Sequence, residues 1–256
     1  MSIQSSRLVD LSVTLGDSPS EAVPVSVEYM PHSLGGGHLA ELVGLETSSL
    51  LGGLGWASER VSSITHSGTH VDAPYHYSPY CGGCPSHTID EMPLDWFFGP
   101  GVKIAVDPTK DGRILPTELA EFERDANYQV KSGDIVLFHT GAENSYGTAS
   151  YNQCGRGLDP ALVELLCDRG VRVFGTDAWS IDPPFQRMRC EAERQGPDSV
   201  WSAHFVGRER EFCAIEKLCN LSELPTHNFW VVCFPVKVCR GSAGWTRAVA
   251  LVNHNA

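Results

Sequence analysis

The sequence predicts an α/β fold, in which helices alternate with buried strands through the second half of the chain. Short apolar runs bounded by turn residues recur at 102–106, 134–138 and 171–175. Runs of this length and composition are typical of strands buried on both faces. Helical patterns separate these runs, and strands that alternate with helices indicate an α/β architecture. The chain has 256 residues, enough for one substantial domain or two small ones.

The first quarter of the chain is rich in Gly, Ser and Pro, particularly over residues 16–58. Its densest glycine runs are Gly35-Gly36-Gly37 and Gly52-Gly53-Leu54-Gly55-Trp56. We expect loops and turns around short strands there. The glycines do not indicate a phosphate site, because no GxxxxGK[ST] sequence and no strand–GxGxxG–helix context accompanies them.

Two helices and two further strands are predicted after the glycine-rich part. The first helix covers 117–124 and follows Pro116. The second covers 161–169 and has clear boundaries, since Asp159 can cap it, Pro160 suits its first turn and Gly170 ends it. The β-rich runs at 229–238 and 246–252 predict strands.

Composition and charge exclude several classes of function. The formal charge is −12, whereas a protein that follows nucleic-acid phosphates or anionic membranes is normally basic. No apolar run approaches the roughly 20 residues that a membrane helix needs. The segment Met1–Val9 shows no signal-peptide pattern, and nine scattered Cys do not form a disulfide framework. We therefore expect a cytoplasmic protein with reduced thiols and no nucleic-acid or membrane partner.

The segment His66-Ser67-Gly68-Thr69-His70-Val71-Asp72-Ala73-Pro74-Tyr75-His76 places three imidazoles and one carboxylate at even positions. In an extended strand, His66, His70 and Asp72 would project from one face, and Gly68 would leave a hollow between them. Pro74 and the poor helix formers before it argue against a helix. We therefore predict a strand or extended loop that ends at Pro74, with His76 just beyond the turn.

Imidazole and carboxylate in this pattern are ligands that suit zinc, manganese or iron in a hydrolytic site. Near pH 7 the Asp is ionised and the His neutral, as binding of a divalent cation requires. The alternative is a His-rich surface loop.

This motif resembles the signature of the cyclase-like metal-dependent hydrolases, the family of bacterial kynurenine formamidase and isatin hydrolase. The resemblance implies that His66, His70 and Asp72 bind metal and that His76 works as an acid or base. It also implies a distant His and a Glu twelve residues later that complete the site, which His204 and Glu216 match. Further matches extend the similarity over most of the chain: Asp10-Leu11-Ser12, Gly175-Thr176-Asp177 and Ser180-Ile181-Asp182.

The resemblance implies a single layered domain over 1–256, of the swivelling β/α/β type, with a mixed β-sheet and flanking helices. It implies one or two divalent ions, Mn²⁺ or Zn²⁺, and a homo-oligomer, either a dimer or a tetramer. We expect hydrolysis of a C–N amide bond in a small aromatic amide, most simply a cyclic aryl amide such as isatin. The alternatives are a kynurenine formamidase, a non-hydrolytic polyketide-type cyclase and a non-catalytic binding protein.

Several residues have more than one interpretation. His76 is either the acid or base, a fifth ligand or a support for another ligand, and Glu216 is either a ligand or an exposed carboxylate on a helix. The Cys81-Gly82-Gly83-Cys84 run is expected to be an exposed loop that borders the site, and 186–198 a lid or an oligomer contact. Asp177 and Asp182 are candidates for a catalytic role or for ordinary turn chemistry. Aromatic residues near the motif line an aryl pocket or belong to the core: Trp56, Tyr75, Tyr77, Tyr80, Trp96, Phe97 and Phe98.

Overall fold

The computed structural model describes residues 6–110 and 112–253. The ends of the predicted domain, 1–256, and the first part of Met1–Val9 lie outside these ranges. Within them, no helix is both long and apolar enough to cross a membrane.

The body of the protein is a nine-stranded mixed sheet with the order β1-β13-β11-β7-β8-β9-β10-β4-β12. Its strands are β1 (Ser6–Asp10), β4 (His70–Asp72), β7 (Phe98–Ala105), β8 (Ile135–His139), β9 (Val173–Thr176), β10 (Cys213–Glu216), β11 (Phe229–Val232), β12 (Ala243–Trp245) and β13 (Val249–Asn253). The four central strands, β7 to β10, are parallel, and antiparallel strands extend the sheet on both sides.

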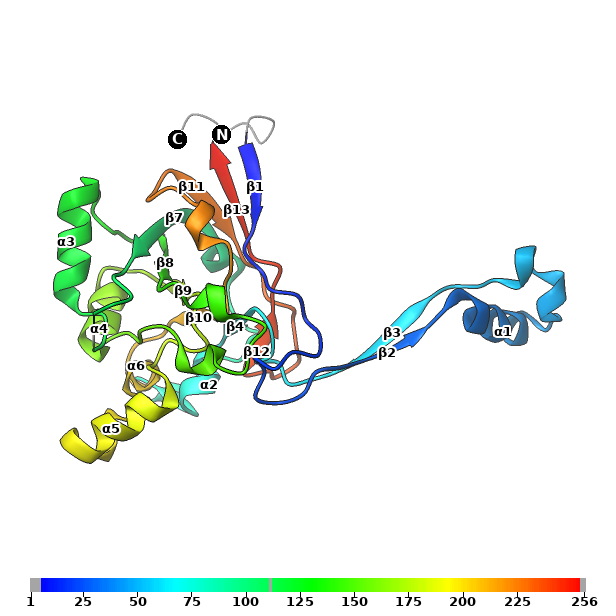
Figure 1. Ribbon diagram of the computed structural model, residues 1–256, viewed down its shortest axis with the longest axis horizontal. Coiled ribbons are helices and arrows are strands. Elements are labelled where there is room, and N and C mark those ends of the chain that lie inside the picture. Colours follow the sequence, from blue (N-terminus) through cyan, green and yellow to red (C-terminus); the bar gives the residue numbers. More distant parts are fainter. Residues whose placement is uncertain (1–5, 111, 254–256) are drawn as a thin grey trace.

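Helices flank the sheet (Figure 1). They are α2 (Pro74–Tyr77), α3 (Pro116–Ala126), α4 (Pro160–Asp168), α5 (Phe185–Gln195) and α6 (Ser202–Phe205). Short 3-10 turns connect the elements: η4 (Leu94–Phe97), η5 (Ala142–Ser145), η6 (Tyr151–Gln153), η7 (Pro197–Ser199), η8 (Val206–Arg208) and η9 (Leu221–Glu223). The predicted mixed sheet with flanking helices is therefore confirmed.

The core lies on both faces of the sheet, as expected for strands that are buried on both sides. On one face, Leu119 of α3 and Leu162 of α4 pack against Val136 and Phe174. On the other face, the alternate residues Leu137 and Val173 join side chains from β11 and β13. The predicted cap of α4 is also present, since the Asp159 carboxylate accepts a hydrogen bond from Ala161 N at 2.9 Å.

An arm, residues 24–63, leaves the body and projects far to one side of it (Figure 1). It is built from the antiparallel strands β2 (Ser26–Met30) and β3 (Ser58–Ser62), with α1 (His32–Val43), η2 (Thr47–Ser49) and η3 (Leu51–Gly53) at its tip. Many of its apolar side chains are exposed: Tyr29, Leu34, Leu42, Val43, Leu45, Leu51, Leu54, Trp56 and Val61.

The expectation that Gly35-Gly36-Gly37 is a loop is wrong, because these residues lie inside α1. The reason is close backbone contact. A Cβ atom on Gly35 would lie 1.9 Å from Trp56 O, and one on Gly36 would lie 2.1 Å from Gly53 O. Glycine therefore lets the helix approach the returning chain, despite its low helix propensity.

Two other expectations need correction. The predicted strand 229–238 ends at Val232, and the chain beyond it is irregular. Glu216 does not lie on a helix but is the last residue of β10.

A short hairpin formed by β5 (Tyr80–Cys81) and β6 (Cys84–Pro85) contains the CxxC segment, whose cysteines are free thiols.

Candidate metal centre

The His66–His76 segment converges on one point, although only part of it is a strand. β4 covers His70–Asp72, and residues 66–69 form a turn in which Gly68 has a φ of +61°. This left-handed conformation favours glycine. The expectation of one extended segment is therefore wrong for His66, because His66 lies in the turn before β4. The turn places the His66 ring next to Asp72. His66 Nδ1 lies 2.8 Å from Asp72 Oδ1.

β4 lies between β10 and β12, and its register brings a distant residue to the site. Glu216 of β10 is the direct partner of His70 in the antiparallel pair. Directly opposed side chains lie on the same face of a sheet. Accordingly, Glu216 Oε2 lies 3.7 Å from His70 Nε2.

His204 enters from α6 and is oriented by Asp182. Its Nδ1 donates to Asp182 Oδ2 at 2.7 Å, and the backbone N–H of His204 also donates to that oxygen. The other ring nitrogen, Nε2, then carries a lone pair and lies 3.5 Å from Glu216 Oε1. It lies 3.9 Å from Asp72 Oδ2. His76 lies in one group with His66 and Asp72, so all six residues expected at the site lie close together: His66, His70, Asp72, His76, His204 and Glu216.

The donor set fits a divalent cation. His70 Nδ1 lies 2.8 Å from the carbonyl oxygen of Gly68, which can only accept, so His70 Nε2 carries a free lone pair. The fully buried Asp72 carboxylate lies 2.8 Å from His66 Nδ1 and 3.2 Å from His70 Nε2. Among the described residues, however, neither of its oxygens nor His70 Nε2 forms a hydrogen bond of regular geometry. Buried polar atoms without partners are rare and suggest a missing ion or water. Two ligand groups share Asp72, one with His66 and His76, the other with His70 and Glu216.

Charges at the site offset the cost of burial. Burial alone would raise the pKa of Asp72, but His76, His70 and His66 hold it well below its usual value. Burial disfavours the charged forms of His70 and His204, yet neighbouring carboxylates raise the pKa of both rings. Carboxylates that attract a proton to these rings also attract a metal ion, so the two compete for the same lone pairs.

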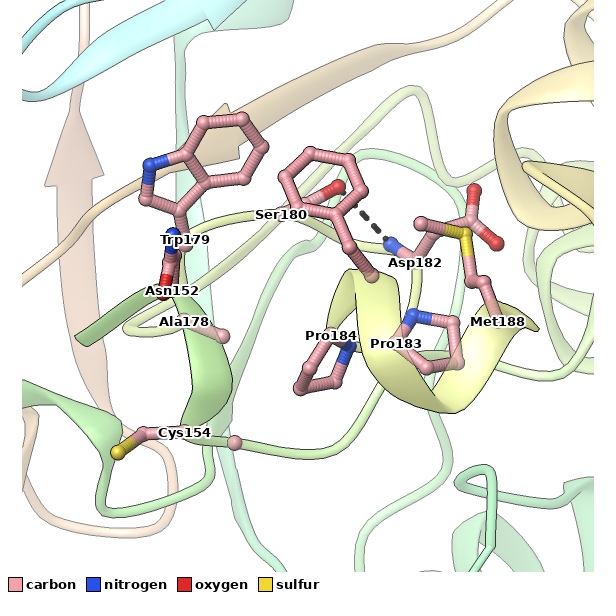
Figure 2. A pocket seen from close by; sticks show the side chains of 11 residues that line it. Asn152, Cys154, Ala178, Trp179, Ser180, Asp182, Pro183, Pro184 and Met188 are labelled. Atoms are coloured by element: carbon pink, nitrogen blue, oxygen red, sulfur yellow. Dashed lines mark hydrogen bonds between the residues drawn. The ribbon is translucent and has the colours of Figure 1, made fainter. Parts of the chain in front are cut away.

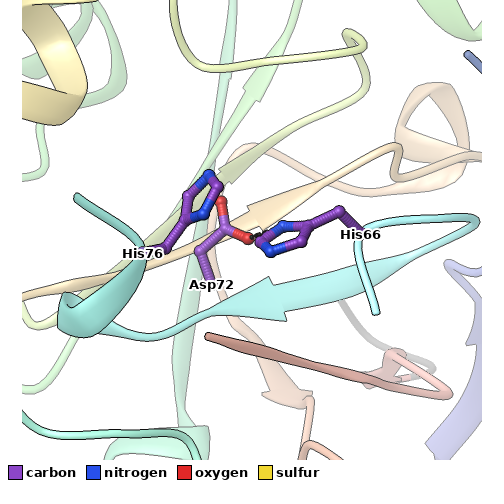
Figure 3. A group of neighbouring side chains, drawn as sticks. All are labelled: His66, Asp72 and His76. Carbon is purple, nitrogen blue, oxygen red and sulfur yellow. Dashed lines mark ion pairs between the residues drawn. The ribbon is translucent and has the colours of Figure 1, made fainter. Parts of the chain in front are cut away.

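His76 differs from the other imidazoles. It lies in the short helix α2, which begins at Pro74, and its ring centroid is 4.0 Å from that of His66. Figure 3 shows the Asp72 carboxylate beside both rings. Burial lowers the pKa of His76 to about 4, although the Asp72 charge opposes that shift.

A cavity of about 370 Å³ opens in front of these residues. Its aromatic walls are Trp179, Phe185 and Trp201, and Trp201 stacks on His204 with ring centroids 4.5 Å apart. Trp201 has a φ of +58°, an uncommon conformation for a bulky residue. Figure 2 shows the adjoining hollow, where the Ser180 hydroxyl accepts from Asp182 N beside Trp179.

The aromatic residues near the motif do not line this cavity. Tyr77 and Phe97 are buried in the core, and Trp56 belongs to the arm. Neither Cys81 nor Cys84 is among the lining residues of the cavity. From the predicted lid or contact segment, 186–198, Met188 of α5 reaches the cavity wall.

Asp177 and His139 have structural contacts outside the site. Asp177 accepts from the backbone N–H groups of Thr140 and Glu143 and from the Thr140 hydroxyl. His139 pairs with Glu143 at 3.0 Å, and Glu143 accepts from Leu221 N. This cluster resembles a metal site in composition, but its carboxylates already have partners.

Sequence reasoning did not identify three neighbours of the site. Asp182 orients His204, Trp201 stacks on it, and the Lys217 ammonium donates to His66 O. Asp182 and His204 are 22 residues apart, and no local pattern relates them. The signal that was available is the Asp-Pro pair at 182–183, which fits a turn equally well.

Comparison with known proteins agrees with this arrangement. The family model described as "Putative cyclase" matches residues 9–183, more than half of the chain. Kynurenine formamidase from Delftia acidovorans is 32% identical over 194 residues, which cover 74% of this chain and 78% of that protein. Kynurenine formamidase from Salinibacter ruber is 28% identical over 186 residues, 72% of this chain and 75% of that protein.

Solved structures show the same fold. Isatin hydrolase A from Labrenzia aggregata, bound to benzyl benzoate, superposes with a TM-score of 0.76 at 23% identity and covers 98% of this chain and 95% of its own. An isatin hydrolase bound to the product analogue thioisatinate gives a TM-score of 0.75 at 21% identity, covering 98% and 94%. With its sequence match and the converged motif, this chain belongs to the cyclase family.

Proposed function

We propose that the protein is a metal-dependent hydrolase that cleaves a C–N amide bond of a small cyclic aryl amide such as isatin. One observation carries this proposal. The Asp72 carboxylate is fully buried, and its described contacts are with imidazole nitrogens, 2.8 Å from His66 Nδ1 and 3.2 Å from His70 Nε2. The neighbouring His66, His76, His204 and Glu216 line an aromatic cavity. A buried carboxylate of this kind needs a cation.

We propose that His66, His70, Asp72, His204 and Glu216 hold one or two divalent ions, manganese or zinc. When bound, such an ion makes hydroxide available near pH 7 and polarises a carbonyl group. His66 can use Nδ1, because the Ser242 hydroxyl, 2.9 Å from Nε2, can accept the proton on the other ring nitrogen.

His76 moves the proton in this proposal. Its ring lines the cavity and is neutral at pH 7, since burial lowers its pKa to about 4. A neutral imidazole can accept a proton from the attacking water and return it to the leaving nitrogen. Trp179, Phe185 and Trp201 orient the aryl ring and exclude water from the reacting bond.

The second candidate substrate is an aryl formamide such as N-formylkynurenine, which is favoured by the kynurenine formamidases among the sequence relatives. The aromatic walls suit both compounds. A planar bicyclic amide fills such a slot without a flexible tail, and for that reason we place the cyclic amide first.

We also propose that the protein is a cytoplasmic homodimer. Nine free thiols support a reducing compartment. The exposed apolar side chains of the arm support association, because monomeric proteins rarely expose large contiguous apolar patches.

The test combines elemental analysis of the purified protein with a panel of isatin, N-formylkynurenine and related cyclic imides. We expect about one or two Mn or Zn ions per chain, turnover of isatin and loss of turnover on chelation. His204→Ala and Glu216→Gln should bind less metal. Turnover confined to the formamide would select the second candidate. Metal without turnover of any amide would indicate a binding protein or a non-hydrolytic cyclase.

A further inference from the structure

We propose that Glu21 and Lys217 are positioning residues, a buried ion pair that clamps the 66–69 turn to the end of β10 and sets the metal affinity of the site. This inference rests on the metal-dependent function proposed above. It concerns two side chains that the mechanism does not otherwise use.

The two charged groups of the pair lie close together, and both side chains are almost completely buried. Lys217 Nζ lies 2.6 Å from Glu21 Oε2, and the two side chains are 2% and 3% exposed. The same ammonium donates to His66 O at 2.9 Å. The other carboxylate oxygen, Glu21 Oε1, accepts from Gly68 N at 2.9 Å. Both members of the pair therefore hold the turn that carries His66.

The backbone of Lys217 holds the same turn from its other side. Its carbonyl oxygen accepts from Thr69 Oγ1 at 2.6 Å, and its N–H donates to Ala178 O at 3.1 Å. Lys217 has a φ of +59°, a conformation that a long side chain adopts only where the surroundings impose it. Lys217 directly follows Glu216, so its backbone contacts hold that proposed ligand in place. Its ammonium contact with His66 O holds a second proposed ligand, His66.

Lys217 lines the cavity, and two of its three ammonium protons are donated within the protein, to Glu21 and to His66 O. The ammonium also lies 5.2 Å from the centroid of the Trp179 ring. Its charge is therefore paired with Glu21, and its hydrogen bonds orient the neighbouring turn. The contacts of Glu21 with the turn and with Lys217 likewise occupy both of its oxygens.

The position of Glu21 adds a second consequence. It lies three residues before the arm begins, so the clamp also fastens the root of the arm to the metal-binding turn. Removing either charge would leave the other buried and unpaired. The turn would then lose its anchor on β10, and His66 its fixed approach to Asp72.

The test compares Glu21→Gln, Lys217→Met and the double variant with the wild-type protein. Affinity for Mn²⁺ and Zn²⁺ is measured by competition with a chelator, and Tm is measured on the metal-free protein. We expect metal affinity to fall about 10–100-fold, the range found when groups that orient metal ligands are removed. The double variant has no unpaired charge, but its turn is still unanchored, so its affinity should stay low.

The matched control is Glu123→Gln, which disrupts another partly buried pair, that of Glu123 on α3 with Arg169 at the end of α4. It should lower Tm and leave metal affinity unchanged. Wild-type metal affinity in both single variants would overturn the inference, and so would recovery of affinity in the double variant. A wild-type protein that binds no metal would instead reject the proposed function.

Discussion

His70 and His76 show how the balance between burial and facing carboxylates shifts the pKa of imidazoles that lie within a few ångströms of one another. The pKa of His70 is raised by the carboxylates that face it, whereas the pKa of His76 is lowered to about 4 by burial. The first environment favours a cation, and the second keeps a ring neutral and able to accept a proton.

His76→Ala should therefore retain near-normal metal content while kcat falls by about 10²–10⁴, the usual contribution of a general acid or base. Metal content and kcat are to be measured on the same preparation. If His76 were instead a ligand, metal and activity would be lost together, and that result would contradict the assignment.

The low pKa of His76 also predicts a pH dependence of stability in the metal-free protein. Between pH 6.5 and about 4 the unfolded chain binds a proton at this residue and the folded protein does not. The free energy of unfolding therefore decreases as the pH falls through this window, by up to about 3 kcal/mol from this residue. In His76→Gln, the free energy of unfolding should decrease less between pH 6.5 and pH 4.5 than in the wild-type protein. Urea titrations at the two pH values, with EDTA present, measure this difference. An unchanged slope would contradict the shift.

Asp182→Asn should weaken metal binding about 10–100-fold, because Asp182 fixes the tautomer and orientation of His204. Isothermal titration with Zn²⁺ measures the effect. Asp134→Asn, which alters a buried carboxylate bonded to Tyr128 and Lys131, serves as the control and should leave the affinity unchanged. Equal affinity in Asp182→Asn and the wild-type protein would show that His204 is not a ligand.

The residues of the site differ in how far the sequence could identify them. The motif from His66 to His76 is local, so its spacing alone indicated a metal, and the family pattern added His204 and Glu216. Asp182 was a candidate from the sequence, but its contact with His204 and the stacking of Trp201 could not be found in this way, because both depend on where α6 places His204. The cavity aromatics were missed for the same reason, since Trp179 and Phe185 follow β9 rather than the motif.

At the scale of the elements, strands and helices with strong boundary signals were predictable. β8, β9 and α4 lie within one or two residues of their predicted ranges. α1 was not predictable, because three consecutive glycines normally end a helix. Tertiary contact decides their conformation: Gly35 and Gly36 face the returning chain at distances that no Cβ atom allows.

This contact gives a test with a built-in control. Gly36→Ala places a Cβ 2.1 Å from Gly53 O, so the tip of the arm must open. Hydrogen exchange over residues 32–56 should accelerate in that variant. Gly37→Ala meets nothing within 4 Å and should slow the exchange, because alanine favours a helix by about 0.5–1 kcal/mol over glycine. Equal exchange in the two variants would contradict the packing of the tip.

At the scale of the whole molecule, the arm is the feature that the sequence did not predict. A two-stranded hairpin is marginally stable by itself in water, and this one extends away from its own body (Figure 1). The arm spans 40 residues, more than the about 20–30 that each partner gives to a standard interface. A second copy of the chain is the partner that we expect, since twofold dimers are the commonest assembly.

If the protein is the homodimer proposed above, Leu42→Glu combined with Leu51→Glu should make it monomeric, as judged by light scattering across a range of concentrations. The two leucines are 75% and 97% exposed on the arm, and charges there would be buried on association. Leu115→Glu, at the start of α3 on the far side of the body, should remain dimeric. A wild-type monomer, or a dimer in the double variant, would exclude the arm as the interface.

The position of β4 in the sheet has a consequence for the order of events during synthesis. This three-residue strand carries His70 and Asp72, yet both of its neighbours, β10 and β12, come from residues beyond 212. When only the motif has emerged from the ribosome, three of the five proposed ligands have been made, but His204, Glu216 and the strands that flank β4 have not. Ion capture therefore follows nearly complete translation, and a loaded metal reports that the chain has reached its final topology.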